Sequence, residues 1–76
     1  MEDVTTTVDA TGQKCPMPVL MTAKAAKGLE AGQTMLIIAT DAGARSDIPA
    51  WVSQTGNELV DSSEEGETLK FYVRKK

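Results

Sequence analysis

Residues 4–20, VTTTVDATGQKCPMPVL, predict a passage from a β-strand into an α-helix. Valine or threonine occupies every second position from residue 4 to residue 8, and such β-branched alternation is typical of a strand over residues 4–9. A glycine then breaks the pattern and predicts a loop. Proline is favoured in the first turn of a helix, where its missing N–H group would have no partner. Pro16 and Pro18 therefore predict that a helix begins at Cys15.

The body of this helix is predicted over residues 19–29, which are rich in alanine, leucine, methionine and lysine. Ala31 and Gly32 are expected to lie beyond its end. Helical spacing places one group of residues against a sheet and another on the opposite side. The sheet-facing group comprises Val19, Leu20, Ala23 and Ala26, and the outward group comprises Met21, Lys24 and Gly28.

A second strand and a second helix follow. The apolar run of residues 35–39 does not alternate, which predicts a central strand covered on both sides or lying at the sheet interior. Ser46 or Asp47 is expected to cap the second helix, with Pro49 in its first turn. Gly56 is expected to end it in the left-handed conformation. Its buried stripe is predicted to comprise Ile48, Trp51, Val52 and Thr55.

Two further strands complete the pattern. A short strand is predicted over residues 58–61, residues 62–66 are expected to form a hairpin turn, and residues 69–73 alternate apolar with polar side chains. The element order is therefore β-α-β-α-β-β. Right-handed crossovers would place both helices on one face of a mixed four-stranded sheet. We expect a single domain over residues 1–76 with the fold of an α/β (α+β) two-layer sandwich.

The composition limits the possible functions. A domain of 76 residues has a thin core, so any chemistry is expected near its surface. The net charge of -3 argues against nucleic-acid binding, which needs a basic face, and the basic residues 74–76 are expected to be a solvated end. The sequence shows no signal-peptide pattern, and its longest apolar run is too short to cross a bilayer. These features predict a soluble, cytoplasmic protein without membrane contact.

The chain contains one cysteine and no histidine. These counts exclude an internal disulfide, a dithiol switch within the chain, a Cys–His nucleophilic pair and a zinc site built from cysteine and histidine. We expect no metal site and no cofactor.

Cys15 has the greatest reactive potential in the chain. Helix N-termini lower the pKa of cysteine thiols, and Lys14 adds a positive charge beside it in sequence. One interpretation is a small buried apolar residue, because free cysteines are commonly inert. An exposed thiolate would instead be a nucleophile, a redox sensor or a sulfur carrier. Carrying requires only an accessible thiolate, a rigid mount and docking surfaces, and a persulfide is a reversible cysteine modification.

Candidate docking residues lie near the starts of both predicted helices. Met17 and Met21 are adaptable apolar contacts. Arg45 and Asp47 precede or begin the second helix, and a β-α-β-α layout places that helix start at the same sheet edge as Cys15. Capping and loop charge are the simpler roles for this segment, with partner docking as the alternative. Trp51 and most of the methionines are expected to fill the core.

The pattern Asp9-x-x-Gly12-x-x-Cys15-Pro16-Met17-Pro18 resembles the signature of the TusA (SirA-like) sulfur-carrier family, with its Cys-Pro-x-Pro motif. The resemblance covers nearly the whole chain. It continues through Gly32, the strand residues 36–39, Asp41, the stretch Asp47-Ile48-Pro49-Ala50-Trp51, and Thr55-Gly56.

This resemblance implies the same two-layer sandwich and a persulfide carried on Cys15, flanked by Lys14, Pro16, Met17 and Pro18. It implies a protein sulfur donor, such as a cysteine desulfurase or a rhodanese-like protein, and a protein sulfur acceptor. Family routes include thiolation of transfer RNA, molybdenum cofactor biosynthesis and sulfur oxidation, and some relatives are linked to selenium. Such a carrier has no catalytic machinery of its own, although it can be classed as a sulfurtransferase. We expect a monomer.

This chain departs from the family at Asn57, where members commonly carry a histidine after the second-helix glycine. Two alternatives also stay open. One is a redox or regulatory protein in which Cys15 forms mixed disulfides. The other is an RNA-interaction module of similar fold, although the acidic balance and the lack of an aromatic stacking platform argue against it.

Overall fold

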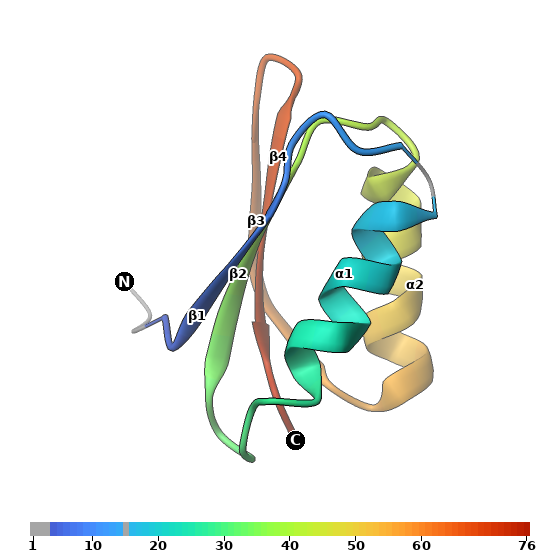
Figure 1. Ribbon diagram of the computed structural model, residues 1–76. Helices are drawn as coiled ribbons and strands as arrows, with labels where there is room; N and C mark the ends of the chain where they lie inside the picture. The colour runs from blue at the N-terminus through green and yellow to red at the C-terminus, as the bar shows by residue number, and fades with distance from the viewer. Residues whose placement is uncertain (1–3, 15) are drawn as a thin grey trace.

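A computed structural model of the chain describes residues 4–14 and 16–76 and contains four strands and two helices over these residues (Figure 1). Their order confirms the predicted β-α-β-α-β-β pattern. The elements are β1 (Thr6–Ala10), α1 (Met17–Ala26), β2 (Thr34–Ala39), α2 (Ala44–Thr55), β3 (Glu58–Glu65) and β4 (Thr68–Arg74).

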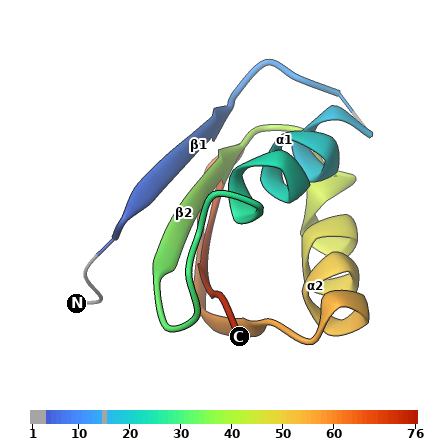
Figure 2. The ribbon, with the colours of Figure 1, turned by 60° about the horizontal axis from the view of Figure 1, so that its bottom comes forward.

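The strands form one mixed sheet in the order β1-β2-β4-β3. β1 is parallel to β2, and β4 is antiparallel to both of its neighbours. Figures 1 and 2 show both helices on the same side of this sheet. The predicted two-layer sandwich with two helices on one face is therefore confirmed.

The core lies between the helices and the sheet. Alternate strand residues are buried on the helix-bearing face, and they meet Ile48 and Val52 of α2. β2 lies at the sheet interior, as predicted. Its burial alternates, however, because the helices cover one face, and Leu36 and Ile38 are half-buried on the other. The buried strand residues are Val8, Ala10, Met35, Ile37, Ala39, Leu69, Phe71 and Val73.

The sheet-facing side of α1 agrees only in part with the prediction. Ala26 is buried and Val19 packs against the core, as expected, but Leu20 and Met21 do not follow it. The buried residues of α1 are Pro18, Thr22 and Ala26, whereas Leu20 is 55% exposed. Met21, expected to face outward, packs against the core. A threonine can occupy the buried stripe because its Oγ1 donates a hydrogen bond of 2.7 Å to the carbonyl oxygen of Pro18.

The ends of α1 also differ from the prediction. Pro16 occupies the N-cap position and the helix begins at Met17. It ends at Ala26 rather than at residue 29, because Gly28 and Leu29 donate their N–H groups to carbonyls only three residues back and so form a turn. Leu29 is nevertheless buried in the core.

The start of α2 lies earlier than predicted. Gly43 is the N-cap residue, not Ser46 or Asp47, and Pro49 lies inside the helix rather than in its first turn. The loop provides the helix start through its own backbone, since Ala44 N–H donates to the carbonyl oxygen of Asp41. At the other end Gly56 has a φ of 74°, which confirms the predicted left-handed cap.

Two other local predictions were wrong. Thr55 is exposed, and its hydroxyl donates to the carbonyl oxygen of Trp51. β3 continues through residues 62–65, which pair with β4, so the turn is confined to Gly66 and Glu67. Polar residues are tolerated there because β3 is an edge strand.

Residues 74–76 were predicted to be a solvated basic end, but Lys75 is held by several hydrogen bonds. Lys75 Nζ donates to the carbonyl oxygen of Ala26 at 2.7 Å. The Lys75 backbone also exchanges hydrogen bonds with Gly32 and Gln33.

Candidate functional site

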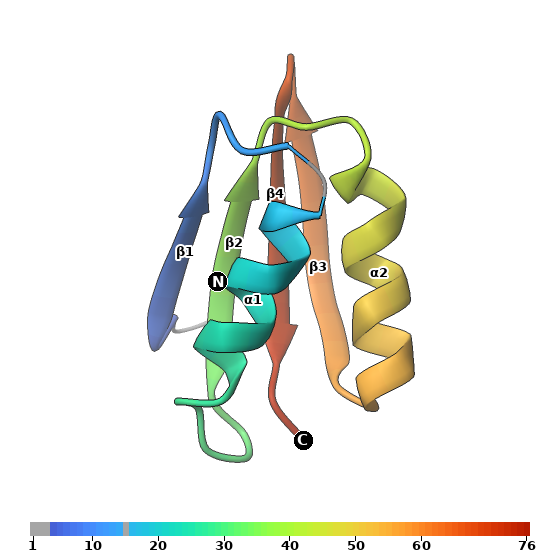
Figure 3. The same ribbon diagram turned by 45° about the vertical axis from the view of Figure 1, so that its right-hand side comes forward.

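The two loops that precede the helices meet at one edge of the sheet. β1 and β2 are parallel, so their carboxyl ends lie together and each leads into a helix (Figure 3). The Gly12 N–H donates a hydrogen bond of 2.9 Å to Thr40 Oγ1. This bond joins the loop after β1 to the loop after β2, which confirms the shared sheet edge expected for the two helix starts.

The loop after β1 is held by local hydrogen bonds. Asp9 Oδ1 accepts from the backbone N–H of Thr11 at 3.1 Å and from its Oγ1 at 2.6 Å. These two bonds, the side-chain one first, lower the pKa of Asp9 from its ordinary value of 3.8. Gln13 N–H donates to the carbonyl oxygen of Ala10. The chain is therefore constrained as it approaches residue 15.

Cys15, the predicted sulfur-carrying residue, lies outside the described residues. Its flanking residues are placed. Met17 N–H donates to the carbonyl oxygen of Lys14 at 2.8 Å, and Leu20 N–H donates to that of Pro16 at 3.1 Å. Lys14, Pro16 and Met17 are exposed. Pro18 is fully buried, so it fixes the first turn of α1 to the core.

The prolines limit the hydrogen-bond donors available at this helix start. Pro16 and Pro18 have no backbone N–H group. The N–H group of Met17 is already bonded to Lys14. Residues 16–18 therefore have no free N–H group to donate to an anion near this helix start. They can stabilise such an anion through the peptide dipoles of α1.

A shallow groove lies between the two helices next to Pro16. This Trp51 groove has a volume of about 310 Å³. Asp47 lines it together with Pro16, so one predicted docking residue shares a surface with the cysteine motif. The remaining lining residues are Val19, Ala50, Trp51 and Gln54.

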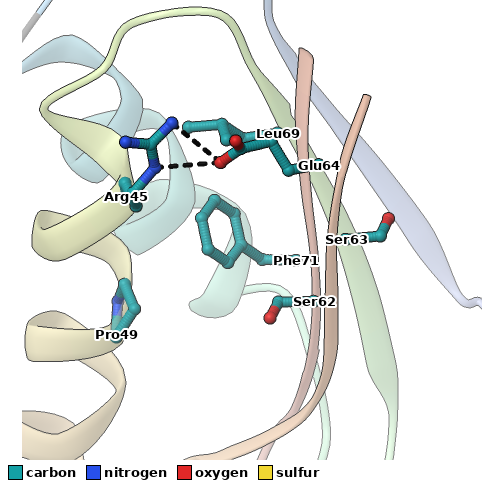
Figure 4. A pocket seen from close by; sticks show the side chains of 7 residues that line it. All are labelled: Arg45, Pro49, Ser62, Ser63, Glu64, Leu69 and Phe71. Carbon is teal, nitrogen blue, oxygen red and sulfur yellow. Dashed lines mark hydrogen bonds and ion pairs between the residues drawn. The ribbon is translucent and has the colours of Figure 1, made fainter. Parts of the chain in front are cut away.

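Arg45 points toward the hairpin instead. Its Nη2 lies 2.8 Å from Glu64 Oε1, and its Nε donates to the same oxygen at 2.9 Å. Figure 4 shows this ion pair beside the ring of Phe71, in a pocket of about 230 Å³ between α2 and the β3–β4 hairpin. The structure therefore places Arg45 in a different pocket from Asp47 and Pro16.

Met21 lines another groove, between α1 and β1, with a volume of about 520 Å³. This β1 groove is formed by Thr7, Val8, Asp9, Met21, Lys24, Ala25 and Gly28. Met21 is thus separated from the Trp51 groove by the width of α1, and only Met17 of the two candidate methionines flanks Cys15.

Sequence reasoning missed Trp51 as a surface residue. Trp51 packs against the core, as its helical spacing predicts, yet it is only half-buried and lines the groove beside Pro16. A tryptophan is too large to be covered by the thin core of a domain this small. Its size could therefore have predicted that it is partly exposed.

Residues 4–14 and 16–76 contain neither a metal-binding cluster nor a membrane-spanning helix. No group of three or more histidine, cysteine, aspartate or glutamate side chains in this part of the chain is arranged to hold a metal ion. None of the helices described there is long and apolar enough to cross a membrane.

Comparison with known proteins relates residues 6–75 to the family model described as Sulfurtransferase TusA. The sulfur carrier protein TusA of Allochromatium vinosum is 41% identical over 75 residues, which cover 99% of each chain. That of Pseudomonas entomophila is 44% identical over 70 residues, covering 92% of this chain and 88% of the relative.

The fold is also similar to that of a solved structure, the SirA-like protein DSY4693 from Desulfitobacterium hafniense. The TM-score is 0.80, with 24% sequence identity, over 91% of this chain and 95% of that one.

Proposed function

Since the chain belongs to the TusA sulfurtransferase family, whose relatives named above are sulfur carriers, we propose that it carries a sulfane sulfur as a persulfide on Cys15. The observation that supports this assignment is the exposure of the residues on either side of Cys15, at a helix start anchored by the buried Pro18. A carrier needs such an accessible and rigid position, because the partner protein must reach the sulfur atom.

The proposed transfer is an exchange between thiolates. The Cys15 thiolate attacks the terminal sulfur of a donor persulfide, the sulfur–sulfur bond of the donor breaks, and the donor cysteine leaves as a thiolate. An acceptor thiolate then attacks the terminal sulfur on Cys15 in the same way. Neither step needs an external oxidant or reductant, because each breaks one sulfur–sulfur bond and forms another.

In this proposal the chain positions the sulfur-carrying residue and provides the positive charge that favours its thiolate. Lys14 and the dipole of α1 favour the thiolate, and Met17 provides an exposed apolar contact for a partner. Pro16 and Asp47 share the Trp51 groove, so this groove, which includes a residue of the cysteine motif, is the proposed docking surface. Arg45 is a weaker docking candidate because its guanidinium is paired with Glu64.

We further propose that the partners are proteins of a cytoplasmic sulfur relay. The donor would be a cysteine desulfurase or a rhodanese-like protein. The acceptor would serve transfer RNA thiolation, molybdenum cofactor biosynthesis or sulfur oxidation. We propose that residues 1–76 form a single carrier domain and that this domain functions as a monomer.

Mass spectrometry of the intact chain tests the assignment. The reduced protein is incubated with a cysteine desulfurase and cysteine, and in parallel with a rhodanese and thiosulfate. A gain of about 32 Da that thiol reagents reverse is expected for the wild type but not for Cys15→Ser. If neither donor adds sulfur while glutathione disulfide modifies Cys15 readily, the carrier assignment is wrong and a mixed-disulfide function replaces it.

A further inference from the structure

Thr40 connects the end of the sheet to the loop that precedes Cys15. Ala10 and Ala39 are the last pair that joins β1 to β2, and both are fully buried. Thr40 follows directly in sequence, and its Oγ1 accepts the hydrogen bond of 2.9 Å from the Gly12 N–H group. This side-chain bond therefore extends the contact between the two strands beyond the end of the sheet.

The bond holds a defined turn. Gln13 N–H donates to the carbonyl oxygen of Ala10 at 3.2 Å, and Gly12 has a φ of 78°, whereas Thr11 does not have a positive φ. These features are those of a type II turn with glycine as its third residue, and we call it the Gly12 turn. The bond that closes such a turn leaves the N–H group of the third residue unused. This group is therefore available to bond Thr40.

The residue that carries the sulfur in the proposed function follows this turn closely. Cys15 comes two residues after Gln13 in sequence, and the next fixed point is the start of α1. That start is held by the buried Pro18 and by the bond from the Leu20 N–H group to the carbonyl oxygen of Pro16. The sequence position of Cys15 is thus between a turn attached to β2 and a helix anchored in the core.

Thr40 also begins the loop that leads into α2. This helix forms most of the wall of the Trp51 groove, to which it contributes Asp47, Ala50, Trp51 and Gln54. The bond from Gly12 to Thr40 therefore joins the loop before Cys15 to the loop before the docking helix. A partner seated on α2 meets the sulfur at a constant position only if these two loops are held together.

We propose that Thr40 is a positioning residue for sulfur transfer, an inference that rests on the proposed function. Its hydroxyl holds the Gly12 turn, so that the sulfur on Cys15 keeps one position relative to a partner in the Trp51 groove. The exchange requires the attacking thiolate to be aligned with the sulfur–sulfur bond that it breaks. Thr40 acts through the turn and takes no part in the exchange of bonds.

A role in stability alone is the simpler alternative. The fold depends little on this bond, because β1 and β2 are already paired along the whole of β1. Gly12 is exposed and Thr40 is half-buried, and one hydrogen bond near solvent has a modest net effect on stability. A loss of transfer rate without a comparable loss of stability therefore distinguishes positioning from stabilisation.

Transfer of sulfur from a persulfidated cysteine desulfurase tests the proposal. Thr40→Val removes the acceptor at nearly constant volume, Thr40→Ala removes it without adding an apolar group, and Thr40→Ser retains a hydroxyl. Thr55→Val is the matched control, because it removes a threonine hydroxyl at the far end of α2. The mass gain of the intact chain is followed in time at increasing donor concentrations. Alkylation of Cys15 by iodoacetamide and urea unfolding are measured for each variant.

We expect the maximal transfer rate to fall about two- to tenfold in Thr40→Val and Thr40→Ala, the range that one net hydrogen bond controls. The half-saturating donor concentration should stay constant, because the groove itself is intact. Thr40→Ser should restore the rate, and Thr55→Val should keep it. Alkylation should proceed equally in all variants, because a small reagent needs no docked partner.

Several results would overturn the positioning role while the wild type still accepts sulfur. One is an unchanged maximal rate in Thr40→Val and Thr40→Ala, and another is a Thr40→Ser variant as slow as these two. A change confined to the half-saturating concentration would assign Thr40 to docking, and an equal loss in alkylation would assign it to the reactivity of the thiol. A loss of rate that follows the loss of stability would leave Thr40 a structural role alone. A wild type that gains no sulfur overturns the proposed function, and this role with it.

Discussion

Among the described residues of the Cys-Pro-x-Pro motif, 16–18, Pro18 is buried, and its carbonyl oxygen accepts the hydrogen bond from Thr22. The other two, Pro16 and Met17, are exposed, and Met17 is 41% exposed. The motif therefore combines an anchor in the core with a surface that a partner can reach. Substitutions at Pro18 should act mainly on stability, whereas those at Met17 should act on partner contact.

The hydrogen bonds between Thr11 and Asp9 predict a measurable titration effect. The carboxyl of Asp9 should titrate below its ordinary pKa of 3.8, and Thr11→Ala should raise that pKa toward the ordinary value because the side-chain donor is lost. A carbon-detected NMR titration of the side chain measures both. An unchanged midpoint in Thr11→Ala would show that this bond does not hold the loop in solution.

The direction of the pH dependence follows from the lowered pKa. The folded chain binds this proton less readily than the unfolded chain, so charged Asp9 favours the fold above the unfolded pKa. This contribution disappears as the pH falls through the folded pKa. Asp9 is fully exposed, so we expect the change to concern the loop after β1 rather than global unfolding.

At the level of elements, α1 shows which features sequence periodicity can predict and which it cannot. The helix was predictable from its proline start and its helix-forming residues. Its buried face was predictable only in part: Ala26 and Val19 face the core as expected, but hydrophobicity favours Leu20 over Thr22 for the core position. Thr22 is buried because the carbonyl of Pro18 satisfies its hydroxyl, and this bond depends on a side-chain rotamer that sequence spacing does not reveal.

The buried stripes of the helices predict a contrast between two truncations. Ile48→Ala should lower the free energy of unfolding by about 2–4 kcal/mol, because Ile48 is completely buried and its loss leaves a cavity. Leu20→Ala should change it by no more than about 0.5 kcal/mol, because this side chain is mostly exposed.

Urea unfolding followed by circular dichroism measures both variants. The two residues are large aliphatic side chains on helices, so Leu20→Ala serves as the matched control for helix propensity and side-chain size. A large loss of stability in Leu20→Ala would mean that Leu20 faces the sheet after all.

The start of α2 and the hairpin show a second limit of sequence reasoning. Asp47 and Ser46 are good capping residues, yet Gly43 precedes the helix because backbone bonds to Asp41 and Ala42 already close its first turn. Similarly, the serine and glutamate residues of 62–65 suggested a turn but form an edge strand, where one side of each residue faces solvent. Strand pairing overrode local propensity in the hairpin, whereas backbone hydrogen bonds within the loop decided the start of α2.

At the scale of the whole molecule, the topology was the most predictable feature. Alternating helices and strands of these lengths, together with right-handed crossovers, permit few arrangements. The shared sheet edge of the two helix starts followed directly from that topology. The grooves did not, because they depend on how far α1 lies from β1 and from α2, and no residue pattern encodes those distances.

The bond between Gly12 and Thr40 predicts coupling of the two loops at this sheet edge. Thr40→Ala removes the acceptor, so the Gly12 amide should exchange with solvent about two- to tenfold faster, consistent with the modest net strength of one hydrogen bond. Hydrogen exchange measured by NMR is the test.

Thr55→Ala is the control for this measurement, because it removes a threonine hydroxyl that bonds only within its own neighbourhood at the far end of α2. Gly12 exchange should not respond to it. Equal exchange rates in the wild type and in Thr40→Ala would mean that the two loops move independently.

The anchoring of Lys75 has a practical consequence for handling the protein. Its ammonium group bonds the last carbonyl of α1, and its backbone pairs with the segment between α1 and β2. Lys76 N–H also donates to Asn57 Oδ1. Truncations that delete these two residues would remove ties to three separate segments. Purification tags or fluorescent fusions should therefore retain both lysines and follow them with a spacer.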